Sequence, residues 1–130
     1  ADVAHAMPNY LVQPLREPTD PAYNSQWNYR TMNLPAAWDE TTGSSGVVVA
    51  VIDSGIVADH PDFGGRLLGG YDFVSNTAYS ADGDGRDSNP NDPGYGGVFH
   101  GTHVAGIIGA ATNNGFGVAG VDWNARILPV

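Results

Sequence analysis

The most regular hydrophobic pattern in the chain is an unbroken apolar run at residues 47–52, with the sequence VVVAVI. Gly46 precedes this run, and the polar segment Asp53-Ser54-Gly55 follows it. A short run rich in β-branched residues and bounded by turn residues is typical of a strand in a parallel sheet. The pattern therefore predicts a strand that is buried on both faces.

A second pattern, from Gly101 to Ala111, has helical spacing. Val104, Ile107, Ile108 and Ala111 follow one another at steps of three, one and three residues, so they share one face of a predicted helix. The same segment has small residues at positions 101, 105, 106 and 109. Each glycine lowers helix stability by roughly 1 kcal/mol relative to alanine, so we expect close packing against a sheet to compensate.

Two shorter elements complete the pattern. A helix is predicted to begin near Pro35 and to end before Gly43, and a further buried strand is predicted at residues 126–130. Residues 1–24 contain four prolines and no helical period, which indicates an extended arm or linker. The order of strand, loop, helix and strand predicts an α/β fold with a doubly wound, mostly parallel sheet.

The predicted strand at residues 126–130 ends the chain in the middle of this pattern. A sheet that stopped there would expose an apolar edge, which natural proteins avoid. We therefore expect further chain, or a second chain, to cover that edge.

Composition narrows the classes of function. The 130 residues fit one domain, and a formal net charge of −9 argues against nucleic acid and anionic membrane surfaces as partners. The absence of cysteine excludes disulfides and thiolate metal sites. No apolar run is long enough to span a bilayer.

Asp53 and His100 are the residues best placed for chemistry. Asp53 follows a predicted parallel strand, where open α/β sheets place their functional groups, and His100 stands at the start of the predicted helix. A carboxylate that accepts a hydrogen bond from imidazole Nδ1–H fixes the tautomer and stabilises the imidazolium that forms when Nε2 takes a proton. This pair would make a general base.

Four segments resemble the subtilase family of serine peptidases. They are VIDSG at 51–55, HPD at 60–62, HGTHVAG at 100–106 and GVAGV at 117–121. The segments GYDFVSN at 70–76 and DGDGRD at 82–87 are similar to those of extracellular calcium-dependent subtilases of Gram-negative bacteria. The resemblance covers about residues 20–130, the front part of such a catalytic domain.

The resemblance implies a secreted serine endopeptidase that hydrolyses peptide bonds in protein or peptide substrates. Its fold would be a three-layer α/β/α sandwich, of which this chain holds the N-terminal portion. Asp53 would be the triad aspartate, His100 the general base and His103 a buried structural residue. The nucleophilic serine would lie beyond Val130, so the 130 residues alone are predicted to be inactive.

The resemblance also implies a division of the chain. Residues 3–10 resemble the last strand of an inhibitory propeptide. Residues 1–17 are therefore expected to be an extended arm left from that propeptide, and residues 18–130 the front of the catalytic domain. The partners implied are the chain's own propeptide and the remainder of the catalytic domain, on the same or a separate chain.

Calcium is the cofactor that the resemblance implies. The family's principal site would take side-chain oxygens from Gln26, Asp62 and Asn114. Backbone carbonyls would complete it at Thr112, Phe116 and Val118. A second site is indicated by Asp82, Asp84 and Asp87, whose alternation with glycine resembles half of an EF-hand loop.

Three alternative functions remain open at this point. The segment Asp53-Ser54-Gly55 after an apolar strand is also the signature of aspartic peptidases, in which two chains would each supply one aspartate. Asp53, His100 and His103 could instead hold zinc in a hydrolase, although two histidines three residues apart form a weak zinc motif. The chain could also be an inactive calcium-binding or folding module.

Overall fold

The computed structural model describes residues 5–8, 15–80 and 82–130. Two strands and four α-helices lie within them, together with three short 3₁₀ turns. In chain order the elements are η1 (Tyr23–Ser25), α1 (Trp27–Thr31), α2 (Leu34–Glu40), β1 (Val48–Val51), η2 (Pro61–Phe63), α3 (Thr77–Ser80), η3 (Tyr95–Gly97), α4 (His100–Gly109) and β2 (Arg126–Pro129). No helix among these residues is long and apolar enough to cross a membrane.

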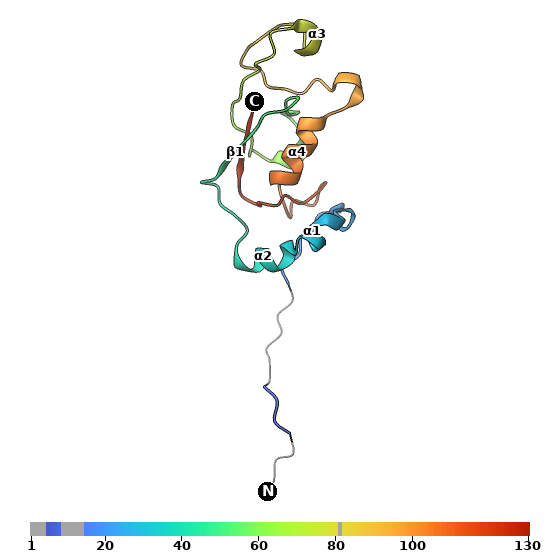
Figure 1. Cartoon of the computed structure of the whole chain (residues 1–130), viewed down its shortest axis with the longest axis vertical. Coiled ribbons are helices and arrows are strands. Elements are labelled where there is room, and N and C mark those ends of the chain that lie inside the picture. Colours follow the sequence, from blue (N-terminus) through green and yellow to red (C-terminus); the bar gives the residue numbers. More distant parts are fainter. Residues whose placement is uncertain (1–4, 9–14, 81) are drawn as a thin grey trace.

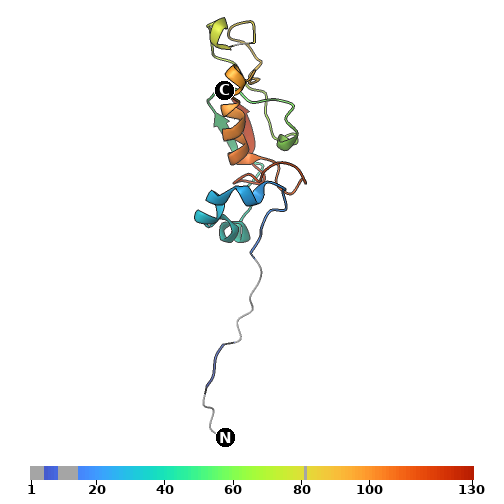
Figure 2. The same ribbon diagram turned by 90° about the vertical axis from the view of Figure 1, so that its right-hand side faces the viewer.

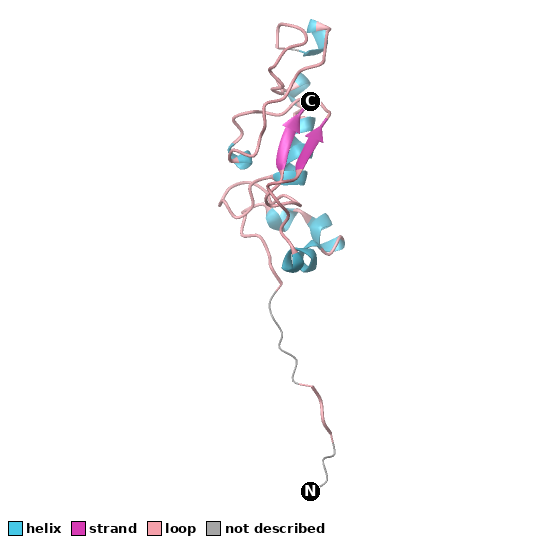
Figure 3. Cartoon of the chain, turned by 90° about the vertical axis from the view of Figure 1, so that its left-hand side faces the viewer, coloured by secondary structure: helices cyan, strands magenta, loops and turns pink. Residues whose placement is uncertain are grey.

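The two strands form a parallel pair with α4 packed on one face. Val48 pairs with Arg126 and Val51 with Pro129. Figure 1 shows β1 and α4 between α3 on one side and α1 and α2 on the other, and Figure 2 shows the same order in a view turned by 90°. In Figure 3 both strand arrows point the same way. The predicted α/β class with parallel pairing is confirmed, as are the helix that begins near Pro35 and the strand that starts at Arg126.

The hydrophobic core consists of two clusters. One joins the sheet to α4, and the other joins α1 and α2 to the segment that follows α4. The first contains Val51, Ile56, Phe63, Ala105 and Ile127. The second contains Tyr23, Tyr29, Leu34, Trp38 and Ala119.

The prediction that β1 is buried on both faces is wrong for the described residues. Val51 is 4% exposed, but Val48 is 50% exposed and Ile52, just after the strand, is 81% exposed. Side chains alternate between the two faces of a strand. Only one face of β1 packs on α4, and the apolar side chains of the other face are not covered by described residues.

The prediction that residues 1–24 are an arm outside the core is wrong for its last part. Residues 5–8 and 15–18 form no helix or strand, while residues 1–4 and 9–14 lie outside the described residues. Asp20 and Tyr23, however, are each 4% exposed. The Asp20 carboxylate accepts hydrogen bonds from the backbone N–H groups of Asn113 and Asn114, which ties this segment to the loop after α4.

Glycine is required where α4 and its following segment meet other backbone. A Cβ at Gly101 would collide with the carbonyl oxygen of Gly55, and one at Gly120 would lie 2.7 Å from the backbone nitrogen of Ala110. Gly106, in contrast, has open space around its missing Cβ within the described structure. The expected close packing of α4 is therefore confirmed at Gly101 but does not explain Gly106.

We predict that Gly120→Ala lowers the free energy of unfolding by about 1–3 kcal/mol, because backbone atoms cannot move aside as a flexible side chain can. Gly69→Ala is the matched control, since nothing lies within 4 Å of a Cβ built there. Urea unfolding of both variants and the parent measures the difference. Equal losses in the two variants would contradict the close approach at Gly120.

Candidate active site

Asp53 is held at the carboxyl end of β1 by the continuation of strand pairing. Its backbone N–H donates to the carbonyl of Val130 at 3.1 Å, just beyond the last residue of β2. The Asp53 side chain is 18% exposed. The carboxylate therefore projects from a fixed backbone at the edge where α/β sheets place functional groups.

His100 is the first residue of α4 and its ring meets the Asp53 carboxylate. Nδ1 lies 2.8 Å from Oδ1 and 2.8 Å from Oδ2 of Asp53. Since the carboxylate is an acceptor, Nδ1 carries the proton, which leaves Nε2 of the neutral ring as an acceptor. The His100 side chain is 66% exposed. This arrangement can take a proton at Nε2 while Asp53 stabilises the resulting positive charge.

Opposing effects act on the Asp53 carboxyl group. Partial burial favours the neutral form and so raises the pKa, whereas hydrogen bonds from His100 and from the backbone N–H of Ser54 favour the carboxylate. The hydrogen bonds outweigh burial, so the pKa of Asp53 lies below its ordinary value. Asp53 is thus kept ionised as the partner of the imidazole.

Ser54 and Asp92 form a supporting layer that the sequence patterns did not single out as a site. The Ser54 hydroxyl donates to Oδ2 of Asp92 at 3.0 Å and accepts from the backbone N–H of Gly101 at 3.0 Å. Asp92 is 2% exposed. In the sequence Asp92 resembles the other aspartates of an acidic loop. The one signal that distinguishes it is its position between Pro90 and Pro93, outside the alternation of aspartate and glycine at 82–87.

His103 differs from the prediction that it is a buried structural residue. It lies one turn beyond His100 on α4, and its side chain is exposed, on a cavity of about 720 Å³. Gln26, Asp62 and Phe116 line the same cavity. The helical spacing places His103 on a face of α4 that the described residues do not cover.

The structure brings together part of the predicted principal calcium site. Asp62 is 3% exposed, and its carboxylate accepts hydrogen bonds from Asn114 Nδ2 and from the backbone N–H of Val118, both at 2.9 Å. A Cβ at Gly117 would overlap this carboxylate. Asp62 makes no ion pair with any described residue and both of these donors are neutral, but Arg66 lies close enough for its charge to interact with the carboxylate.

The other predicted ligands of this site contact different groups in the structure. The Gln26 amide exchanges two hydrogen bonds of 2.9 Å with the backbone of Ala119. The Thr112 hydroxyl donates to the carbonyl of Ala110 and accepts from the N–H of Gly120. Phe116 donates its N–H to Oδ1 of Asn114. These contacts hold the loop around Asp62 in a fixed shape.

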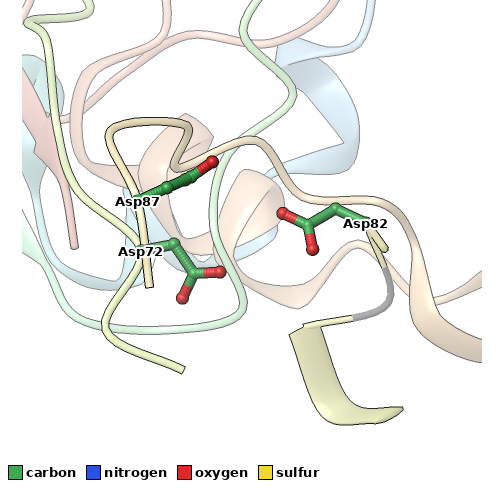
Figure 4. A group of neighbouring side chains, drawn as sticks. All are labelled: Asp72, Asp82 and Asp87. Carbon is green, nitrogen blue, oxygen red and sulfur yellow. The ribbon is translucent and has the colours of Figure 1, made fainter. Parts of the chain in front are cut away.

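The predicted acidic site is only partly assembled as expected. One oxygen from each of Asp72, Asp82 and Asp87 lies within 4.8 Å of the other two, whereas Asp84 is not in this group. Figure 4 shows the three side chains. Asp72 enters it because its backbone pairs with that of Asp87. The charges of Asp87 and Asp82 raise the pKa of Asp84, and a hydrogen bond from Ser80 lowers the pKa of Asp82.

An α/β fold with a carboxylate–imidazole pair at the end of a parallel strand is an arrangement found in hydrolases with catalytic triads. Residues 44–130 match the model of the Subtilase family, and the chain belongs to this family. The resemblance of the sequence motifs to the subtilase family is thereby confirmed.

Individual relatives agree with this assignment. The chain is 41% identical over 150 residues to the extracellular basic protease of Dichelobacter nodosus and 40% identical over 114 residues to thermitase of Thermoactinomyces vulgaris. These alignments cover 99% and 87% of the chain, but only 25% and 36% of the two relatives. A solved protease structure from Pseudoalteromonas arctica PAMC 21717 is 47% identical with a TM-score of 0.76, over 87% of this chain and 38% of that one.

Two of the alternative functions are not supported. The aspartic-peptidase hypothesis is wrong, because Asp53 pairs with an imidazole from a helix and the chain belongs to a serine-peptidase family. The zinc hypothesis required Asp53, His100 and His103 to converge. Within the described residues only Asp72, Asp82 and Asp87 form a group of three such side chains with metal-site spacing.

We predict that His100→Ala raises the pKa of Asp53, because burial continues to disfavour the carboxylate after the strongest hydrogen bond is lost. A carboxyl group with a lowered pKa stabilises the fold above its ordinary pKa, and this contribution disappears as pH falls through the lowered value. The difference in stability between parent and variant should therefore shrink in acid. Carboxyl ¹³C NMR titration and urea unfolding measure the two effects.

His103→Ala is the matched control for this titration, since His103 makes no side-chain hydrogen bond to Asp53 in the described structure. An Asp53 pKa that is the same in the parent, His100→Ala and His103→Ala would contradict the pairing.

Proposed function

We propose that this chain is the front part of the catalytic domain of a secreted, calcium-stabilised serine endopeptidase, and that it supplies the aspartate and the general base of the triad. The single observation that carries the proposal is the contact between His100 Nδ1 and the Asp53 carboxylate at 2.8 Å, in a chain of the subtilase family. Secretion is supported by relatives named as extracellular proteases.

In the proposed reaction His100 accepts a proton at Nε2 from a serine hydroxyl as the serine oxygen attacks the peptide carbonyl. Asp53 stabilises the imidazolium, which then returns the proton to the leaving amine. None of the serines in the described structure hydrogen-bonds to the His100 ring. We therefore place the nucleophile in chain that follows Val130, which also agrees with the uncovered apolar face of β1.

The proposed endopeptidase function also implies the partners of the domain. The substrate is a protein or peptide, and the remainder of the catalytic domain packs on the apolar surfaces left open by β1 and α4. We assign residues 1–17 to the end of an inhibitory propeptide and residues 18–130 to the domain. The boundary is supported by burial, since residues 15–17 are exposed while Pro18 and Asp20 are buried.

Calcium fits the chemistry of the loop around Asp62. A buried carboxylate with only neutral hydrogen-bond partners is stabilised by a cation, and calcium binds carboxylate, amide and carbonyl oxygens. Asp62 would hold the ion with the side chains of Gln26 and Asn114 and the carbonyls of Thr112, Phe116 and Val118. A second ion would neutralise Asp82 and Asp87, with Asp84 in the same loop and Asp72 from the paired segment.

The test of the proposed function is labelling by a serine-directed fluorophosphonate. Residues 1–130 alone should show no labelling and no peptide hydrolysis, because a base without a nucleophile cannot form an acyl-enzyme. Protein that includes the following segment should be labelled at one serine, and His100→Ala should abolish the labelling. Stoichiometric labelling of a serine within residues 1–130 would overturn the proposed site.

We further predict that a calcium chelator lowers the melting temperature of the protein. At a calcium concentration one hundred times Kd, a single site adds about 2.7 kcal/mol of stability. In Asp62→Asn the difference between calcium and chelator should shrink by the contribution of the principal site, whereas the control Asp59→Asn, at an exposed carboxylate, should retain the full difference. Equal melting temperatures of the parent with and without chelator would contradict the calcium proposal.

A further inference from the structure

A buried carboxylate, Asp92, lies behind the Asp53–His100 pair and takes no part in the proposed reaction. Its side chain accepts three hydrogen bonds: from the Gly94 N–H at 2.9 Å, from the Ser54 hydroxyl at 3.0 Å and, more weakly, from the Thr102 hydroxyl at 3.5 Å. With 2% exposure it is as buried as the apolar core. Burying a carboxylate costs free energy unless hydrogen-bond donors stabilise its charge, and these three donors do so.

The two hydroxyl groups that donate to Asp92, those of Ser54 and Thr102, connect the end of β1 to the start of α4. Ser54 follows Asp53 directly, and its oxygen accepts from the Gly101 N–H at 3.0 Å. Thr102 Oγ1 accepts from the Val57 N–H at 3.0 Å. Amide groups in the first turn of a helix have no acceptor within the helix, so Ser54 supplies one for Gly101.

Donation to Asp92 determines what the Ser54 hydroxyl can do. A hydroxyl has one proton, and while this proton points to Asp92 the oxygen presents lone pairs to Gly101. Without Asp92 the proton could turn to the Asp53 carboxylate, whose Oδ1 already accepts the Ser54 N–H at 2.7 Å. Ser54 would then compete with His100 for Asp53 and would no longer fix the start of α4.

We propose that Asp92 is a positioning residue for the general base. It orients the Ser54 and Thr102 hydroxyls, and these fix the backbone after Asp53 relative to the backbone after His100. The proposal rests on the proposed function only in treating His100 as the base. Asp92 touches neither His100 nor the reacting atoms and acts through Ser54 and Thr102.

Several ionisable groups surround the His100 imidazole and the cavity beside Asp53. Asp53 contacts His100 directly, Asp92 lies behind Ser54, and His103 follows one turn along α4. The other ionisable side chains on the cavity beside Asp53 are Asp72, Tyr71, Tyr79 and Tyr95. All of these stay in place in the variants below, except Asp92 itself.

The experiment uses the whole protease and compares Asp92→Asn, Ser54→Ala and Ser54→Thr with the parent. Two readouts are taken: the pH profile of kcat with separate kcat and KM, and the NMR resonance of the His100 Nδ1 proton. Asp92→Asn and Ser54→Ala should lower kcat about tenfold or more, with KM changed less, because the base is misplaced. Ser54→Thr keeps the hydroxyl and should keep near-parent kcat.

The pH profile and the spectrum separate positioning from simple loss of folded protein. A weaker bond to Asp53 disfavours the imidazolium, so the acidic limb of the kcat profile should move to lower pH in Asp92→Asn and Ser54→Ala. The Nδ1 proton of His100 should shift or broaden in both. Glu40→Gln, which removes an exposed carboxylate from α2, controls for net charge and should change neither readout.

Each outcome decides the proposal. If Asp92→Asn fails to fold, Ser54→Ala carries the test, because Ser54 is exposed and its truncation leaves no large cavity. An unchanged acidic limb and an unchanged Nδ1 resonance in folded Ser54→Ala would overturn the proposal. If the parent is not labelled by a fluorophosphonate, the proposed function fails separately, and the Nδ1 resonance alone decides whether Asp92 positions His100.

Discussion

The close approach of α4 to the end of β1 is the constraint on which the site depends. The backbone of Gly101 lies so near the Gly55 carbonyl that a Cβ would collide with it, and only at this separation can an imidazole on the first residue of α4 reach the carboxylate after β1. The contact also makes the Gly101 N–H available to Ser54. Packing and chemistry are therefore set by the same few atoms, and a larger residue at position 101 would separate the two halves of the pair.

The loop after α4 depends on a different kind of interaction, namely buried carboxylates that bind backbone. Asp20 accepts the N–H groups of Asn113 and Asn114, and Asp62 accepts those of Val118 and the Asn114 side chain. Both carboxylates are nearly inaccessible to solvent. They hold the segment 19–26 and the region around η2 against one loop, which explains why a proline-rich segment that looks like a linker forms part of the core.

Sequence reasoning predicted the elements that have a strong period and the residues in specific motifs. The run at 47–52, the helical spacing from Gly101 and the strand at Arg126 were all found, and Asp53 and His100 meet as expected. The short helices α1 and α3 were missed, because four or five residues are too few to show a period. Asp92 could not be distinguished from a solvated loop residue, since burial is a property of the folded chain and not of local composition.

His103 shows a further limit of such reasoning. The helical spacing correctly predicts its place one turn after His100. Which face of α4 is buried depends instead on the segments that pack against the helix. The surfaces around His103 and β1 remain apolar and open within the described residues, with Ile52 at 81% and Phe116 at 48% exposure. Period and motif therefore identify the helix and its first residue, while the burial of each face is decided by long-range packing.

The acidic side chains of this chain illustrate how one residue type takes on different roles according to its neighbours. Asp53 faces an imidazole and is kept ionised by its hydrogen bonds, so its charge is available to stabilise a proton on His100. Asp92 faces hydroxyls and a backbone amide, so its charge orients dipoles. Asp62 accepts hydrogen bonds from a backbone amide and a side-chain amide, so its charge holds the loop after α4. A net charge of −9 therefore describes the chain poorly, because it does not distinguish a carboxylate that faces an imidazole from one that faces hydroxyls or backbone amides.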